Sequence, residues 1–414
     1  MKNREAVQAS FAQIDITPEY PVSLVGRYRE KPSQGILNRL YAQILLFQKD
    51  GEIFCLAAID SLSLNIPLAS IVREKIAARL GTETSHVMLN FSHTHSAPDP
   101  TPLGVNGEKY FSFLCQQIEK CAETAKHGFS PCKIGWDMVT SAIGENRREG
   151  CTITDNRLGG LIIAHKENGK PIVLVVRISA HPNILPAENL NVSSDFVGAA
   201  REKLQTFYGC PVMILQGAAG NIKARGTNQV GEGNDETFLL ITESLVKSVK
   251  ELQFTLENVS DIQMFSSKMD CCSDIPSKED AIKMSQNTGA QGWLDAVIAA
   301  RAEGIAVQDF QIEVNFLKIN NGCFCGVPNE IFCEIALDAQ NRTNNPFFFL
   351  NGYTNGYAGY FPNQEEWYKG GYEMTLSFLF DYMYTGRLMP YRPETANRLV
   401  DLAAEQWKKV SAEE

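Results

Sequence analysis

Two histidines separated by a single residue are the first feature of this sequence that could do chemistry. His93 and His95 lie in segment 90–98, directly after the apolar run 86–89, which predicts a buried strand. Side chains two residues apart on a strand share a face, so we expect both imidazoles to project together from the end of this strand. Such a pair suits metal binding or proton transfer. So short a motif is equally often just two loop histidines that are hydrogen-bonded to backbone groups.

His181 is the third histidine of interest. It ends the apolar run 172–180, and Pro182 then forces the chain to turn. A histidine at such a junction often lies at the rim of a pocket, although a buried histidine bonded to a carbonyl is the simpler local interpretation. Three histidines at strand ends match the ligands of a catalytic zinc site, in which a carboxylate normally supplies a further oxygen.

Three other segments have compositions that suit a substrate pocket. Arg147, beside Arg148, is the residue type that binds a carbonyl oxyanion or a carboxylate, unless the two form a solvated surface pair. The small-residue loop 217–221 follows an apolar strand and allows close approach of backbone to a substrate or anion. It lacks the lysine of a nucleotide-binding loop, and a simple tight turn is its local alternative. Segment 351–362, rich in Tyr, Gly and Asn, suits a pocket wall or a cover over the core.

The composition excludes several classes of protein. The chain has 414 residues, of which 44% are hydrophobic and 21% charged, and its net charge is −10. An acidic chain is a poor ligand for nucleic acid or for anionic lipid. No apolar run reaches the length of a membrane span, and residues 1–10 lack the apolar core of a secretory signal, so we expect a cytoplasmic location and no membrane insertion. The 11 cysteines have no zinc-finger spacing, and we expect them to be reduced and mostly buried.

The elements that must position these residues alternate between hairpins and helices. We expect hairpins at 40–60, with a turn at 49–51, and at 161–176, with a turn at 166–170. The periodicity predicts helices over 66–80, 108–126, 195–207, 235–252, 277–302, 329–342 and 395–410. Further strands are expected at 12–18, 86–91, 212–216, 261–265, 311–317, 323–327 and 347–350. This order predicts an α/β fold of mixed, largely antiparallel paired sheets flanked by helices, in a single domain over 1–414.

Taken together, these segments resemble the N-terminal catalytic domain of the neutral/alkaline non-lysosomal ceramidase family. The resemblance extends over more than 300 residues in a constant order. Its motifs are Asp15-Ile16-Thr17-Pro18, Ser92-His93-Thr94-His95-Ser96, Glu145-Asn146-Arg147, Ala180-His181-Pro182, Ser194-Asp195-Phe196, Gln216-Gly217-Ala218-Ala219-Gly220-Asn221, Val327-Pro328-Asn329-Glu330 and Asn355-Gly356-Tyr357.

The resemblance implies an amidase with one zinc ion per chain that splits an N-acyl bond. It implies that the metal ligands are His93, His181, Glu330 and Tyr357. His95 and Arg147, with Tyr357, would act on the reacting carbonyl and its oxyanion. The positions expected at the substrate are Gly217, Ala218, Asn221 and Trp367.

The sequence departs from this family where the substrate would bind. After Gly217-Ala218-Ala219-Gly220 the chain continues as Asn221-Ile222-Lys223-Ala224, where the family usually has an aspartate and then a Ser-Pro or Asn-Pro pair, and Trp367 stands where a tyrosine is common. No immunoglobulin-like domain is expected after the catalytic domain. We therefore expect a small polar N-acyl substrate rather than ceramide. A metal-dependent esterase or lactonase, and a non-catalytic protein that binds a ligand on the same scaffold, remain open alternatives.

Overall fold

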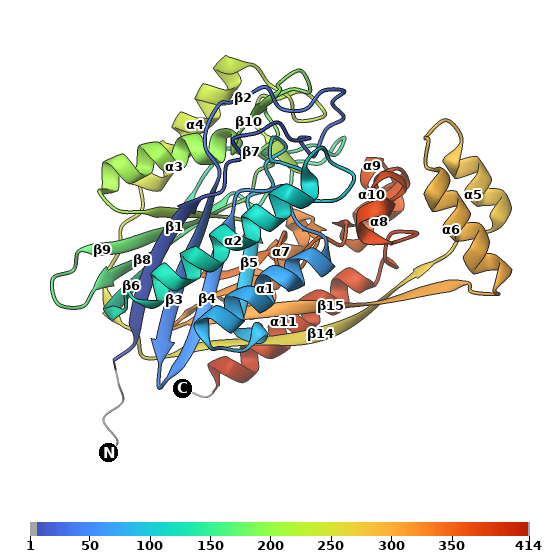
Figure 1. Ribbon diagram of the computed structural model, residues 1–414. Coiled ribbons are helices and arrows are strands. Elements are labelled where there is room, and N and C mark those ends of the chain that lie inside the picture. Colours follow the sequence, from blue (N-terminus) through green and yellow to red (C-terminus); the bar gives the residue numbers. More distant parts are fainter. Residues whose placement is uncertain (1–5, 413–414) are drawn as a thin grey trace.

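Two β-sheets packed face to face form the centre of the computed structural model, which describes residues 6–412, and helices cover both outer faces (Figure 1). The larger sheet has the strand order β11-β9-β8-β6-β1-β3-β4-β5, with β13 beside β6. The pairs β4–β5 and β9–β11 are parallel, and the other pairs are antiparallel. The strands are β1 Gln8–Asp15, β3 Tyr41–Lys49, β4 Glu52–Ile59, β5 Val87–Phe91, β6 Ser130–Thr140, β8 Arg157–His165, β9 Pro171–Ile178, β11 Val212–Gln216 and β13 Glu257–Asn258.

Side chains of the larger sheet alternate between two hydrophobic cores. On β3, Ile44 and Leu46 face helices, whereas Leu45 and Phe47 face the smaller sheet. The helices over this outer face are α1 Ile66–Leu80 and α2 Gly107–Lys126 on one half, and α3 Asp195–Tyr208 and α4 Asp235–Lys250 on the other. This alternation is what a strand buried on both faces requires.

The smaller sheet forms the second inner layer, in the order β14-β15-β16-β18. Its inner face packs on the larger sheet through aromatic side chains such as Trp136, Phe324 and Phe349. Its outer face is covered by two helices. These elements are β14 Ile262–Asp274, β15 Val307–Ile319, β16 Gly322–Gly326, β18 Phe348–Asn351, α7 Cys333–Thr343 and α11 Thr395–Ser411.

The remaining elements are short and gather mainly at one end of the sheets. Helices α5 and α6 stand apart at the end of β14 and β15 (Figure 1), where Trp293 of α6 packs on Phe378 of α10. The short elements are β2 Gly35–Ile36, η1 Thr84–His86, β7 Gly144–Asn146, β10 Asn191–Val192, β12 Ile222–Ala224, α5 Lys278–Ser285, α6 Gln291–Ala302, β17 Glu330–Ile331, β19 Tyr360–Phe361, α8 Gln364–Lys369, α9 Tyr372–Thr375 and α10 Ser377–Thr385.

Local sequence signals explain where several elements begin and end. The side chain of Asn65 accepts a hydrogen bond from the Leu68 amide at the start of α1, and Gly81 ends the helix with a φ of 74°. The turn between β3 and β4 has positive φ at both Asp50 and Gly51, as a two-residue hairpin requires. The predicted helix 66–80 and the predicted hairpin 40–60 are therefore confirmed.

The structure contradicts the predictions of two helices. Segment 277–302 forms two helices, because Asn287 and Gly289 adopt φ values of 62° and 70° that an α-helix cannot contain. The predicted helix 329–342 starts four residues late. Glu330 and Ile331 instead form the short strand β17, which pairs with β19, and α7 begins at Cys333.

Two further expectations, about membrane-spanning helices and about the cysteines, can be compared with the structure. Within residues 6–412, no helix combines the length and the apolarity that crossing a bilayer requires. All eleven cysteines are free thiols, and nine of them are buried.

Candidate metal centre

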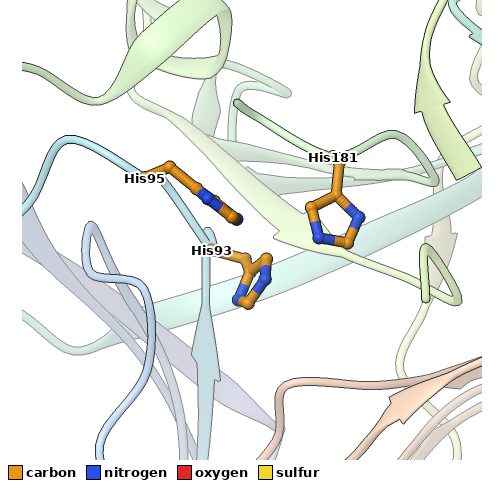
Figure 2. Close-up of side chains that lie close together, drawn as sticks. All are labelled: His93, His95 and His181. Atoms are coloured by element: carbon orange, nitrogen blue, oxygen red, sulfur yellow. The ribbon is translucent and has the colours of Figure 1, made fainter. Parts of the chain in front are cut away.

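Three histidines from two loops lie together at the ends of β5 and β9 (Figure 2). The ring centroid of His93 is 5.0 Å from that of His95 and 4.7 Å from that of His181. Their candidate ligand nitrogens all lie within 4.8 Å of one another. His93 and His95 meet as expected, although through a turn rather than through strand alternation. Strand β5 ends at Phe91, and His93 has a φ of 66°, which is rare for a residue with a side chain and is typical of functional sites.

Each of the three imidazoles is fixed by its Nδ1 atom. Nδ1 lies 2.8 Å from the Leu62 carbonyl oxygen in His93, 3.1 Å from that of Gly26 in His95, and 2.8 Å from that of Ala219 in His181. A carbonyl oxygen only accepts hydrogen bonds, so Nδ1 carries a hydrogen, and in a neutral ring Nε2 then keeps its lone pair. Histidines that bind metals through Nε2 have this tautomer, held by this kind of contact.

Burial keeps two of these rings neutral. It lowers the pKa of His181 to about 4 and lowers that of His95 well below its usual value. Metal binding requires a neutral imidazole, so both rings are ready to act as ligands at pH 7.

Glu330, on β17, brings a carboxylate to the same point. Its Oε2 lies 3.3 Å from Nε2 of His93 and 3.2 Å from Nε2 of His181. Burial raises the pKa of this carboxyl, but His93 and His181 lower it well below its usual range. In the neutral form of both rings, the Nε2 lone pairs of His93 and His181 face this carboxylate oxygen, and His95 Nε2 is buried without a hydrogen-bond partner. Such a cluster of acceptors is unfavourable unless a cation or a proton lies among them, and neutral imidazoles with one carboxylate are the ligands that zinc prefers.

Two tyrosines and an aspartate surround Glu330. Tyr357 donates its hydroxyl hydrogen either to Glu330 Oε1, at 3.1 Å, or to Asp381 Oδ2, at 2.8 Å. Tyr353 donates to Glu330 Oε2, at 3.3 Å, and its ring lies over that of His93. Burial raises the pKa of Asp381 to about 7 and that of both phenols well above 10. Tyr357 thus lies at the centre through Glu330, and its role as a ligand stays a prediction.

Tyr353 and Asp381 were not predicted as site residues. The tyrosine lies in the tract 351–362, whose composition suits a pocket wall or a cover over the core, so composition carried a partial signal for it. The aspartate lies on α10, in a stretch for which no element was expected. Nothing in its local sequence distinguishes it from a surface carboxylate.

Arg147 lies beside the centre in a buried ion-pair network. Its Nε donates to Glu373 at 2.9 Å, and its Nη2 donates to the Gly220 carbonyl at 2.7 Å and to the Tyr360 hydroxyl at 3.0 Å. Burial lowers its pKa, but Tyr360 and Glu373 more than offset this effect and raise it above the usual range. Arg148 continues the network by pairing with Glu373 and Glu366. The two arginines are therefore not the solvated surface pair that the local sequence allowed.

The small-residue loop 217–221 holds His181 and Arg147 in place through its backbone carbonyl groups. The Ala219 carbonyl accepts from His181, and the Gly220 carbonyl accepts from Arg147. A Cβ atom at position 220 would lie 2.4 Å from the Glu330 backbone oxygen, so this close approach requires glycine. The loop thus orients candidate ligands by its carbonyl groups.

The four residues expected at the substrate have other contacts. Ala218 is fully buried in the core of the smaller sheet, and Gly217 is buried as well. The buried Asn221 side chain donates to Glu334 at 2.8 Å. Trp367 donates its indole hydrogen to the Tyr391 carbonyl and packs against a small hydrophobic cluster. None of the four lines the two cavities described next, and their role in substrate binding stays a prediction.

Two cavities flank the candidate centre. The larger, of about 720 Å³, is lined by His95, Arg147 and Tyr360, among others. The smaller, of about 500 Å³, is lined by Tyr357 and Asp381, among others. Both are within the range of small-molecule sites. Three residues line both cavities, namely Gly26, Arg27 and Tyr372.

Comparison with known proteins finds similarity in structure but not in sequence. No protein-family profile matches the sequence, and no curated protein matches it closely enough to be counted. A crystal structure of neutral ceramidase from Pseudomonas aeruginosa superposes with a TM-score of 0.72 and 18% identity, covering 98% of this chain and 75% of the other. A structure titled as ceramidase complexed with C2 gives a TM-score of 0.72 and 16% identity, covering 99% and 76%. The chain has a neutral ceramidase-like α/β fold, as predicted.

Proposed function

We propose that this chain is a metal-dependent hydrolase that cleaves the N-acyl bond of an amide. The observation that carries the proposal is the buried cluster in which Nε2 of His93 and of His181 lie 3.3 Å and 3.2 Å from the Glu330 carboxylate, while both Nδ1 atoms are bonded to carbonyl groups. Zinc is the metal that this set fits best, with His95 or Tyr357 as the further ligand. The ceramidase-like fold supports the same reaction class.

The chain's own residues suit this reaction. A zinc ion at the site would lower the pKa of its bound water from about 15.7 to about 7 and would polarise the substrate carbonyl. His95 is neutral, lines the larger cavity, and has a free lone pair at Nε2 with which it can carry a proton to the leaving amine. Arg147 lines the same cavity and brings a permanent positive charge toward the developing oxyanion.

The substrate that we propose is a small polar N-acyl compound. The larger cavity is walled by charged side chains, among them Arg148, Glu149, Lys369 and Glu373. A long lipid chain offers these groups no hydrogen bonds in place of the water that it would displace, which is costly. A polar amine portion can instead replace the water that they lose.

Chelation tests the proposal directly. Tag-free protein is incubated with a panel of N-acyl amides of differing polarity before and after removal of metal, and zinc is then restored. We expect hydrolysis that is lost with the metal and returns with zinc. Hydrolysis that persists in protein proven free of metal would contradict the proposal. The absence of hydrolysis by zinc-loaded protein across the panel would favour the non-catalytic alternative.

A further inference from the structure

We propose that Arg27 and Arg29 form an anion-binding subsite beside the candidate metal centre, and that the substrate carries a carboxylate. This inference rests on the proposed amidase function and names the class of amide. The two guanidinium groups lie on one loop, which forms a wall of the smaller cavity. An N-acyl amino acid is the simplest compound that has both the amide and the anion.

The loop that carries the two arginines is tied to the histidine cluster. The Gly26 carbonyl accepts the hydrogen bond from His95 Nδ1, at 3.1 Å. A Cβ atom at position 26 would lie 2.6 Å from the His95 ring, so the backbone packs directly on the imidazole. Arg27 follows at once in the sequence, lines both cavities, and lowers the pKa of His95 as a minor contribution beside burial.

The charges of the two arginines are unequally compensated. Arg27 forms an ion pair with Glu232 at 3.1 Å and donates to the Asn183 carbonyl at 2.8 Å. Arg29 donates only to neutral groups, the Asn189 carbonyl at 2.9 Å and the Ser96 hydroxyl at 3.5 Å. Within residues 6–412, no carboxylate forms an ion pair with Arg29. Its guanidinium is thus held in place by neutral contacts while its charge stays unbalanced.

The pKa of Arg29 reflects repulsion between its charge and that of Arg27. Burial and the nearby charge of Arg27 lower the pKa of Arg29 to about 10, and the charge of Glu232, which pairs with Arg27, offsets only a smaller part of this shift. An anion between the two groups would remove that repulsion, and a planar guanidinium binds a carboxylate with paired hydrogen bonds.

The acids of the same cavity are already engaged. Asp99 accepts from the Thr101 amide at 2.9 Å, and Asp381 accepts from Tyr357 at 2.8 Å. Neither bonds to Arg29. The rest of the wall is largely apolar, with Leu24, Leu62, Leu64 and Phe380. The cavity therefore suits a group that is anionic at one side and apolar at the other, such as the leucine half of an N-acyl leucine.

Binding of uncleavable analogues tests the subsite independently of turnover. The probes are ketomethylene analogues of N-butanoyl-leucine and of N-butanoyl-leucinamide, in which a methylene replaces the amide NH. Affinities are measured by calorimetry on zinc-loaded protein. We expect the carboxylate to bind about 10- to 100-fold more tightly than the carboxamide, as for hydrogen bonds to charged groups. Arg29→Gln should remove this preference, and Arg29→Lys should keep part of it.

Control variants and turnover separate the possible failures. Arg79→Gln removes an exposed arginine of α1 and should leave the preference unchanged. Zinc content and thermal unfolding establish that each variant is folded.

Equal affinity for the two analogues, or a preference that survives in Arg29→Gln, would overturn the subsite. A preference in binding with no hydrolysis of N-butanoyl-leucine would keep the subsite and refute the amidase. Moving the carboxylate to the acyl half of the analogue identifies which half the arginines bind, since the tighter isomer has its anion on the correct side.

Discussion

Two buried clusters of charged and polar groups lie on either side of the small-residue loop 217–221, and they are built in opposite ways. In the ion-pair network, Arg147 and Arg148 donate hydrogens to Glu366 and Glu373 at 2.8–2.9 Å. In the candidate metal centre, the Nε2 atoms of His93 and His181 face the Glu330 carboxylate, and in neutral rings all of these atoms are acceptors.

The difference shows which cluster is complete. Buried charges are tolerated when opposite charges and hydrogen bonds satisfy them, as in the arginine network. The centre of His93, His181 and Glu330 meets that condition only when a cation or a proton joins it. The chain thus satisfies one cluster with its own residues, whereas the other has the composition expected of the metal site that we propose.

The largest effect on stability is expected from neutralising the complete cluster. Glu373→Gln removes the one carboxylate that Arg147 and Arg148 share, and breaking a buried pair costs about 3–5 kcal/mol. Urea unfolding of zinc-loaded protein measures this loss. Glu243→Gln, which changes an exposed ion pair with Lys203, is the control and should cost little. Equal, small losses in both variants would mean that the network contributes nothing to stability.

Removing the arginine nearest the centre should affect turnover. Arg147→Ala takes away a positive charge beside the candidate centre in the larger cavity, and we expect kcat to fall by roughly 10²–10³-fold while zinc stays bound. Steady-state kinetics with metal analysis of the same sample gives both quantities. An unchanged kcat in the variant would limit Arg147 to a structural role.

The loop between the clusters should respond to a single methyl group. Gly220→Ala places a Cβ atom 2.4 Å from the Glu330 backbone oxygen, and such overpacking costs about 1–3 kcal/mol. Because Glu330 must move, zinc affinity should fall as well. The matched control is Gly292→Ala on α6, where an added Cβ meets open space and a helix gains about 0.5–1 kcal/mol. Unchanged zinc affinity in Gly220→Ala would show that the loop does not position Glu330.

The smallest expected change in stability is an increase rather than a loss, and it is expected for Glu330→Gln in metal-free protein. In metal-free protein at pH 8, Glu330→Gln replaces one acceptor by an amide that can donate to the histidine Nε2 atoms, and stability should rise by about 1 kcal/mol. The same substitution should abolish zinc binding. A loss of stability in the metal-free variant would mean that protons already satisfy the cluster, as they do in the arginine network.

Sequence predicted best the elements whose ends carry a strong local signal. Asn65 and Gly81 define α1, and Asp50-Gly51 defines the first hairpin. The failures lie where tertiary contacts decide. Glu330 follows a proline and precedes a helical pattern, but its strand β17 exists only because β19, thirty residues later, pairs with it. Local periodicity contains no record of such a partner.

The candidate site divides in the same way. His93, His95 and His181 are identifiable because few other residue types can do their chemistry, and the structure brings them together. Tyr353 and Asp381 are common residue types whose importance comes only from the residue that they touch. The loop 217–221 was predicted from its composition to approach a substrate. Its carbonyl groups bond to His181 and Arg147, a contact that composition does not specify.

The most direct test of the account is elemental analysis of tag-free protein beside two histidine variants. His181→Ala removes a buried imidazole of the centre, whereas His127→Ala removes a solvent-exposed one on a distant surface. We predict about one zinc per chain in the parent and in His127→Ala, and none in a folded His181→Ala. Equal metal content in all three proteins, or no metal in any of them after exposure to zinc, would contradict the claim that these buried acceptors form a metal site.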